Sequence, residues 1–204
     1  LHISWDDNSN PYLPMGIFQI QGNKAMMVGE IAGRNPNNTI EAVCREFDRK
    51  YQGHEAGLFV YGDATAEKQD TKLEKGRTFY GIVMEKLAKY KPQRRVPAAN
   101  PSVVMRGNFI NTVLELKYGG LEICIDESCK LTIADFIGVK EAADGTKNKE
   151  METDPVSKVR FQKYGHFTDL FDYFFCRAFH ETYTKYQRGG KESTLSVVKN
   201  YSRK

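Results

Sequence analysis

The sequence predicts an α/β fold: a mixed sheet, with three antiparallel strands followed by parallel strands, flanked by helices. Three strand-like runs come first in the chain, before any helical pattern. After them, apolar residues at helical spacing alternate with short apolar runs, the order expected when later strands join a sheet in parallel. A chain of 204 residues, 40% of them hydrophobic, is long enough for one domain with a sizeable core.

The first three strands are predicted over residues 2–5, 15–21 and 24–31. Gln21-Gly22-Asn23 is a turn sequence that joins the second run to the third. We therefore expect an antiparallel meander at the N-terminus, with Asp6 directly after its first strand.

A helix and a buried strand follow the meander. The helix starts near Asn38, a capping residue with Glu41 three positions later, and its apolar face extends to Tyr51. Residues 58–61 are a short apolar run, as found in strands that are buried on both faces. Asp63 follows this fourth strand closely, as Asp6 follows the first.

The middle of the chain continues the alternation of helices and strands. Pro92 ends one helical pattern, and Pro101 suits the first turn of the next. Gly119-Gly120 is a two-residue hairpin signal that competes with the end of that helix. We expect, in order, a helix at 77–90, a short strand at 94–98, a helix at 100–116, a hairpin joining 114–118 to 121–126, a helix at 131–139 and a polar loop at 140–157.

The last predicted helix covers residues 167–179, where apolar residues recur at the three-and-four spacing of an amphipathic helix. Its other stripe carries His166, Asp169 and Tyr173, so an imidazole and a carboxylate lie one turn apart. This pair is half of a metal site. The alternative is that Asp169 sits there because negative charge is favoured at a helix N-terminus, with His166 near the cap.

The positive charge of the chain is concentrated at its C-terminus. Residues 181–204 carry a net charge of +4, equal to the formal charge of the whole chain. Two interpretations stay open for this basic tail, contact with a polyanion or a solvated end with Gly189-Gly190 as a hinge. A second basic cluster occupies residues 89–95.

The sequence also limits where the protein acts. No apolar run is long enough to cross a bilayer, and the N-terminus has no signal-peptide pattern. The four cysteines lack metal-finger spacing, and we expect Cys44 and Cys176 to be buried thiols, which suits a reducing cytoplasm. Because the chain enters a strand almost at Leu1, we expect a domain of a longer protein.

The predicted fold brings several acids together. If the first strand pairs with the fourth, Asp6 and Asp63 end side by side at a crevice where ligands of open sheets tend to bind. If the last helix packs on that sheet, His166 and Asp169 reach the same crevice. Clustered carboxylates suit Mg²⁺ or Mn²⁺, and two such ions can clamp the attacking and leaving oxygens of a phosphodiester.

Five stretches, in this order, resemble the C-terminal nuclease domain of phage terminase large subunits. The resemblance covers nearly all of residues 1–180 and implies an RNase H-like fold and a metal-dependent endonuclease that cuts double-stranded viral DNA concatemers during packaging. The stretches are His2-Ile3-Ser4-Trp5-Asp6-Asp7-Asn8 with Asn10-Pro11, Val60-Tyr61-Gly62-Asp63-Ala64-Thr65, Arg95-Val96 with Asn100-Pro101-Ser102-Val103 and Arg106, Ile125-Asp126 with Cys129, and Gly165-His166-Phe167-Thr168-Asp169 with Tyr173.

The resemblance also implies roles for particular residues. Asp6, Asp63 and Asp169 would bind two metal ions, as in the two-metal scheme, and His166 would be an auxiliary ligand or acid–base group. Asp7 stays open as a spare ligand. The expected contacts to the DNA backbone come from basic side chains, namely Lys89, Lys91, Arg94, Arg95 and Arg106.

Further partners follow from the same resemblance. No Gly-x-x-x-x-Gly-Lys-Ser/Thr phosphate loop occurs, so we expect the packaging ATPase domain elsewhere in the full-length chain, with a terminase small subunit and a portal as partners. The expected location is the host-cell cytoplasm, for a phage- or prophage-encoded protein. We expect one nuclease domain over residues 1–180 and a basic tail over residues 181–204.

Two other functions stay open. One is a catalytically silent RNase H-like module that binds DNA or docks on a capsid, and the other is a different nuclease of this fold, such as a junction resolvase. Three further acids receive structural interpretations: Glu41 as a helix-start residue, Asp172 as a solvated residue and Glu30 as a strand end.

Overall fold

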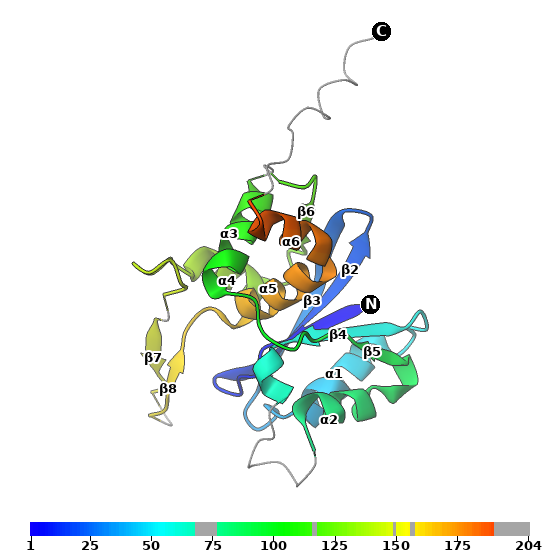
Figure 1. The fold of residues 1–204 in the computed structure, drawn as a ribbon. Coiled ribbons are helices and arrows are strands. Elements are labelled where there is room, and N and C mark those ends of the chain that lie inside the picture. The colour runs from blue at the N-terminus through cyan, green and yellow to red at the C-terminus, as the bar shows by residue number, and fades with distance from the viewer. Residues whose placement is uncertain (68–76, 116–117, 149, 156–157, 190–204) are drawn as a thin grey trace.

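The computed structural model describes residues 1–67, 77–115, 118–148, 150–155 and 158–189. Within these ranges, six strands form one mixed sheet in the order β5-β4-β1-β2-β3-β6 (Figure 1). β2 pairs antiparallel with both β1 and β3, whereas the β1–β4, β4–β5 and β3–β6 pairs are parallel. The predicted fold class is therefore confirmed. The strands are β1 (His2–Trp5), β2 (Tyr12–Gln21), β3 (Lys24–Arg34), β4 (Leu58–Gly62), β5 (Pro92–Arg94) and β6 (Glu122–Ile125).

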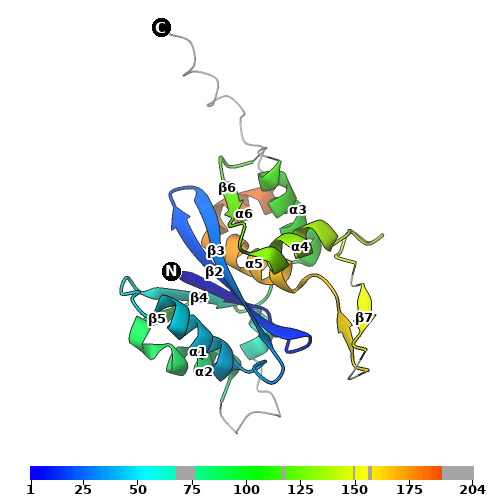
Figure 2. The same ribbon diagram turned by 180° about the vertical axis from the view of Figure 1, so that it is seen from behind.

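Helices cover both faces of the sheet (Figures 1 and 2). One face packs against α1 and α2 in a core that includes Ile3 and Trp5 of β1. The other face packs against α3 and α5 in a second core that includes Phe18 of β2. Six α-helices lie in the described ranges: α1 (Ile40–Tyr51), α2 (Phe79–Lys86), α3 (Val103–Leu114), α4 (Lys130–Gly138), α5 (His166–Ala178) and α6 (His180–Gln187), with short 3-10 helices η1 (Ala64–Glu67) and η2 (Ala88–Tyr90).

α5 packs closely on the strands that it crosses. The hydroxyl of Ser4, in β1, donates a hydrogen bond to the carbonyl oxygen of Leu170 at 2.6 Å. A Cβ atom on Gly16 of β2 would lie 2.5 Å from Cδ1 of Leu170, so the missing side chain leaves the space that Leu170 fills. Phe174 stacks on Phe18 with ring centroids 4.0 Å apart. The site residues at the start of α5 are thus held against the sheet.

Most predicted elements are present, with shifted ends. The first four strands and the helices at α1, α3 and α4 match the predictions, and Thr39 rather than Asn38 caps α1, accepting a hydrogen bond from the amide of Ala42. The helix predicted at 77–90 is divided into α2 and η2, and the following strand is at Pro92–Arg94 rather than 94–98.

The predicted hairpin at residues 114–126 is wrong. Gly119 and Gly120 do adopt positive φ angles of 73° and 56°, as a turn requires, and residues 116–117 lie outside the described ranges. β6 instead pairs in parallel with the edge of β3, with Ala25 opposite Ile123, and this pairing satisfies the backbone groups that the hairpin was expected to satisfy. α3 remains helical to Leu114.

The polar segment at 140–157 is more ordered than its composition indicates. β7 (Met151–Thr153) pairs antiparallel with β8 (Arg160–Gln162), and this ribbon projects from the body of the molecule (Figures 1 and 2). The pattern of β7 gave no signal because all three of its residues are exposed.

The described chain continues beyond the boundary predicted at residue 180. α6 follows α5 directly, and its Tyr183 is buried beside Phe109 of α3, with ring centroids 5.2 Å apart. Cys44 and Cys176 are buried free thiols, as predicted. None of the helices in the described ranges has the length and apolar character that a membrane span requires.

The packing of α5 on β2 gives the first prediction. Phe174→Ala should lower the free energy of unfolding by about 3–5 kcal/mol, because it removes a fully buried ring and leaves a cavity. Ile137→Ala is the control, since this side chain is 79% exposed and should change stability by less than about 0.5 kcal/mol. Denaturant titration measures both, and equal effects would contradict the assigned core.

Candidate active site

A cleft of about 970 Å³ opens at the carboxyl ends of β1 and β4, beside the first turn of α5. Its walls include all four residues that the sequence predicts for the site: Asp6, Asp63, His166 and Asp169. The parallel pairing of β1 with β4 places Trp5 opposite Gly62, so the two aspartates follow neighbouring positions. The amide of Asp63 donates a hydrogen bond to the carbonyl oxygen of Trp5 at 3.1 Å.

Asp6 forms a buried pair with His166. Oδ2 of Asp6 lies 3.1 Å from Nδ1 of His166, and Nε2 of His166 lies 3.0 Å from the carbonyl oxygen of Gln162. Because a carbonyl oxygen can only accept, Nε2 is the donor in the contact with Gln162, and Nδ2 of Asn8 lies 2.8 Å from Nδ1.

The electrostatics of this pair follow from its burial. Burial raises the pKa of Asp6 to about 6; the hydrogen bond to His166 opposes this rise, whereas the charges of Asp169 and Asp63 add to it. Burial alone would lower the pKa of His166, but the interaction with Asp6 outweighs burial and raises it. Negative charge in the cleft is therefore costly at Asp6.

Asp63 is held by hydrogen bonds at the end of β4. Its Oδ1 accepts from the amide and hydroxyl of Thr65, both at 2.7 Å, and from Nδ2 of Asn100 at 2.6 Å. Gly62 precedes it with a φ of +147°, and a Cβ there would lie 2.6 Å from the carbonyl oxygen of Trp5. Asn100 was not predicted as a site residue, because only the folded chain brings it to Asp63.

Asp169 lies in a buried network of four charges. Its Oδ1 is 2.7 Å from Nη2 of Arg106 and 2.9 Å from Nζ of Lys147. The same two cations contact Oδ2 of Asp172, at 3.1 Å from Nε of Arg106 and 2.7 Å from Nζ of Lys147. Burial raises the pKa of Asp169, but Lys147 and Arg106 outweigh burial, so the pKa lies below its usual value.

This network corrects two expectations. Asp172 is not solvated, since it is 2% exposed, and it is held by two cations because a lone carboxylate would be too costly to bury. Arg106 is 3% exposed and is occupied by both aspartates, so it does not offer the surface position expected of a contact to the DNA backbone.

Asp135 provides the anion at the N-terminus of α5. Its Oδ2 accepts hydrogen bonds from the amides of Gly165, Phe167 and Thr168, at 3.0, 2.8 and 3.4 Å. Burial raises its pKa despite these bonds. Asp169 does lie in the first turn of α5, but the carboxylate that accepts from the helix-start amides is that of Asp135. Sequence reasoning missed Asp135, although an acid within the apolar pattern of 131–139 was a usable signal.

Glu30 has a similar role for another helix, which corrects its interpretation as a strand end. It lies within β3, and its two carboxylate oxygens accept from the amides of Leu131 and Thr132, both at 2.8 Å. Glu41 does lie in the first turn of α1, as predicted.

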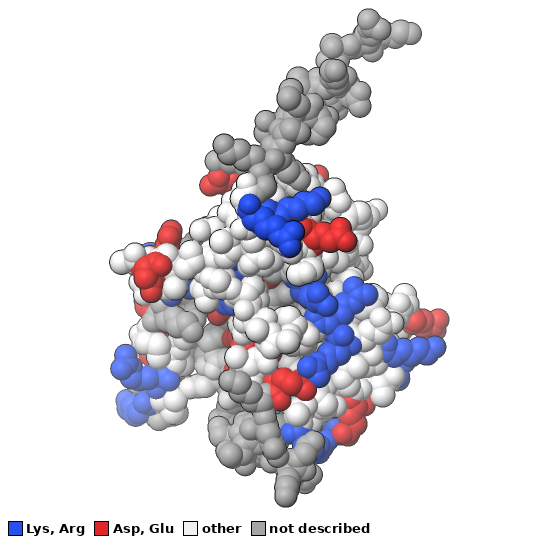
Figure 3. Space-filling model, viewed as in Figure 1, with Lys and Arg blue, Asp and Glu red and all other residues white. Residues whose placement is uncertain are grey.

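The other predicted DNA contacts are exposed on the surface near β5. Arg94 forms an ion pair with Glu67 at 2.8 Å, and Lys89 pairs with Asp48. The guanidinium of Arg95 lies over the ring of Phe59, 3.9 Å from its centroid. Figure 3 shows basic side chains gathered over the region of β4 and β5. Lys91 completes the predicted set and is also exposed.

The donors in the cleft fit a hard divalent cation in chemistry, since three carboxylates face one solvent-open space. Their present arrangement is different: within the described ranges, no three His, Cys, Asp or Glu side chains are grouped closely enough to hold a metal. Asp6 faces His166, Asp63 faces Asn100, and Asp169 faces Arg106 and Lys147.

Comparisons with known structures identify the fold. The chain is similar to the large terminase of the thermophilic bacteriophage D6E, with a TM-score of 0.57 and 15% identity, over 86% of this chain and 38% of that one. It is also similar to the g2p (large terminase) nuclease domain of bacteriophage SPP1, solved with bound Mn, with a TM-score of 0.51 and 17% identity, over 87% of both chains.

These likenesses confirm the predicted RNase H-like fold of a terminase nuclease domain. The chain spans about 38% of the length of the D6E large terminase. No protein-family model and no curated protein sequence matches the chain.

The buried Asp6 gives a prediction on pH dependence. A folded pKa of about 6, above the ordinary value of 3.8, means that ionised Asp6 costs stability once the pH exceeds about 4. With a chelator present to remove metal ions, Asp6→Asn should therefore raise the free energy of unfolding at pH 7.5 by about 2 kcal/mol, and with it the melting temperature. At pH 4 the substitution should have little effect.

Asp126→Asn is the control for this experiment. The hydrogen bond from the Ser128 side chain lowers the pKa of exposed Asp126. Replacing the Asp126 carboxylate by an amide should therefore reduce the stability of the protein slightly at neutral pH. Thermal melts across pH 4–8 separate the two signs, and a pH-independent effect of Asp6→Asn would contradict the assignment.

Proposed function

We propose that this domain is a divalent-metal-dependent endonuclease that cuts double-stranded viral DNA concatemers during genome packaging. The observation that carries the proposal is the meeting of Asp6, Asp63 and Asp169, from three distant segments, in one cleft. The fold is shared with the SPP1 nuclease domain, whose structure was solved with bound Mn.

Each acid would have a defined part in holding Mg²⁺ or Mn²⁺. Asp6, Asp63 and Asp169 would be the ligands of one or two ions. Such ions, when bound, would neutralise phosphate charge and lower the pKa of an attacking water. His166 lies 3.1 Å from Asp6 and would act as an acid–base group or auxiliary ligand. Asn100 fixes the orientation of Asp63.

DNA would be held through its backbone. β1, β4 and β5 are parallel, so their carboxyl ends lie at the same edge of the sheet as the cleft. Arg94 and Arg95 are at the carboxyl end of β5, toward the cleft, whereas Lys89 and Lys91 lie at its amino end, farther from the cleft along the same edge of the molecule. These side chains would bind phosphates without reading bases, whereas Arg106 would act on Asp169 instead of DNA.

The whole protein would contain more than this domain. Because the matched region is 38% of the D6E large terminase, and that protein was also solved with ATP-gamma-S, we place an ATPase domain in the same full-length chain. A small subunit and a portal would complete the packaging assembly in the host-cell cytoplasm.

A second candidate is a catalytically silent DNA-binding or capsid-docking module. The observation in its favour is that Asp169 contacts two protein cations. Cleavage of a plasmid with Mn²⁺ separates this candidate from the nuclease.

Asp63→Ala should abolish Mn²⁺-dependent plasmid cleavage and leave the fold intact, since it removes a proposed ligand at the surface of the cleft. Asp126→Ala is a matched control: Asp126 also follows a strand, and its Oδ1 accepts from the amide and hydroxyl of Ser128, at 2.9 and 2.6 Å, as Asp63 does from Thr65. Asp126→Ala should cleave at the wild-type rate. Cleavage by Asp63→Ala near the wild-type rate would remove Asp63 from the site.

Arg95→Ala should weaken binding of duplex DNA and flatten the plot of log affinity against log salt by about one unit, as expected for the loss of one phosphate contact. Arg45→Ala serves as the control, because Arg45 lines a groove between α1 and β3. Three strands separate β3 from β5 in the sheet. Fluorescence anisotropy at several salt concentrations measures both slopes. Equal slopes for the two variants would argue against a DNA path along β5.

A further inference from the structure

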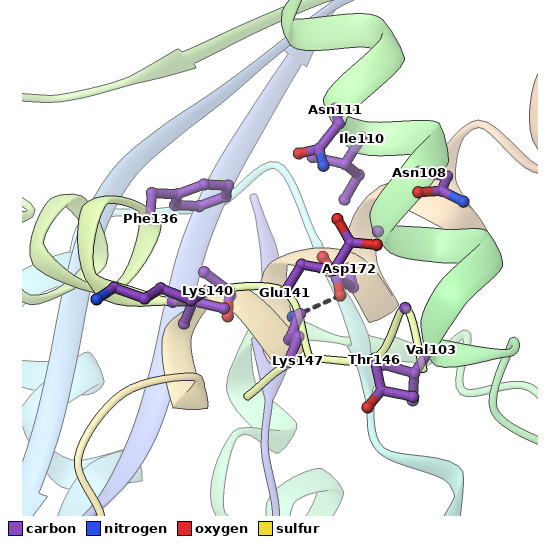
Figure 4. Close-up of a pocket in the computed structure, with 14 residues that line it drawn as sticks. Val103, Asn108, Ile110, Asn111, Phe136, Lys140, Glu141, Thr146, Lys147 and Asp172 are labelled. Carbon is purple, nitrogen blue, oxygen red and sulfur yellow. Dashed lines mark hydrogen bonds and ion pairs between the residues drawn. The ribbon is translucent and has the colours of Figure 1, made fainter. Parts of the chain in front are cut away.

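We propose that Lys147 is a tethered cation that occupies the cation position at Asp169, and that a divalent ion binds there only when Lys147 is displaced. This inference rests on the proposed function, because it concerns the same cleft. Nζ of Lys147 lies 2.9 Å from Asp169 and 2.7 Å from Asp172, so one ammonium bridges two carboxylates as a bound ion would. Figure 4 shows Lys147 reaching Asp172.

The two cations of the network differ in how they are fixed. Arg106 belongs to α3, its side chain is 4% exposed, and its guanidinium lies 4.6 Å from the centroid of the Tyr173 ring. Lys147 belongs to the segment between α4 and β7, on a turn whose described hydrogen bonds are local. In that turn the amide of Ala142 donates to Thr146, and the amide of Asn148 donates to Lys140, both at 2.7 Å. Lys147 is therefore the cation that can leave.

A neighbouring hollow provides a place for the displaced side chain. A cavity of about 120 Å³ lies between α3 and the 139–147 segment, and both Lys147 and Asp172 line it. Glu141 lies on its wall, as Figure 4 shows, and is an acceptor for an ammonium group. Lys147 thus stands between two spaces, the main cleft and this smaller cavity.

Charge balance makes Lys147 and a divalent ion alternatives. With Lys147 in place, two cations balance Asp169 and Asp172, so an added ion would meet a neutral group and a like charge at short range. Without the Lys147 ammonium, the carboxylates of Asp169 and Asp172 together with Arg106 would carry a net charge of about −1. Asp6 and Asp63 face the same cleft. The ammonium therefore keeps the proposed site closed to metal while it remains in place.

The test is calorimetric titration of Mn²⁺ into the wild type and the variants Lys147→Met, Lys147→Arg and Lys130→Met. Lys147→Met keeps the length of the side chain without its charge and should bind Mn²⁺ about tenfold more tightly than the wild type. Lys147→Arg retains the charge, and Lys130 is an exposed lysine at the start of α4, away from the cleft, so both variants should stay near the wild-type affinity.

Thermal melts distinguish this role from a purely structural one. Lys147→Met should melt at a lower temperature than the wild type without metal, because a buried partner is lost, and Mn²⁺ should raise its melting temperature by more. Equal or weaker Mn²⁺ binding by Lys147→Met, with binding by the wild type intact, overturns this inference alone. Absence of Mn²⁺ binding by every variant overturns the proposed metal site together with it.

Discussion

The structure depends on the burial of α5 against the sheet. Every residue from His166 to Cys176 is buried, so this helix has no solvated stripe on which a polar side chain can rest. Its carboxylates must therefore find partners inside the protein. Asp169 and Asp172 obtain them from Arg106 and Lys147, and the helix start obtains Asp135. The charges that form the cleft and the packing that holds it are thus parts of one arrangement.

Local patterns were sufficient to predict where the acids lie. Strand periodicity placed Asp6 and Asp63 at the ends of two strands, and the pairing of β1 with β4 follows from the order of the elements. The helical spacing of α5 correctly marks a core face, but it does not reveal that Asp172 on the same helix is buried. Short strands with exposed residues, such as β7, left no periodic signal.

The partners of those acids could not be predicted, because they come from distant segments. Lys147 lies in a stretch whose composition indicated only a polar loop, and Arg106 looked like any basic residue that could meet DNA. Asn100 reaches Asp63 across 37 positions of sequence. Which charge meets which is a property of the folded chain, and it decides whether a carboxylate can accept a metal or is already neutralised.

The proposed role of Asp6, Asp63 and Asp169 is to form a divalent-cation site. This role can be tested by soaking crystals of the wild type and of the Lys147→Met variant in Mn²⁺ and measuring the anomalous diffraction of manganese. We expect manganese peaks within coordination distance of these three carboxylates, with higher occupancy in Lys147→Met. Crystals that bind Mn²⁺ elsewhere, or nowhere, in both proteins would contradict it.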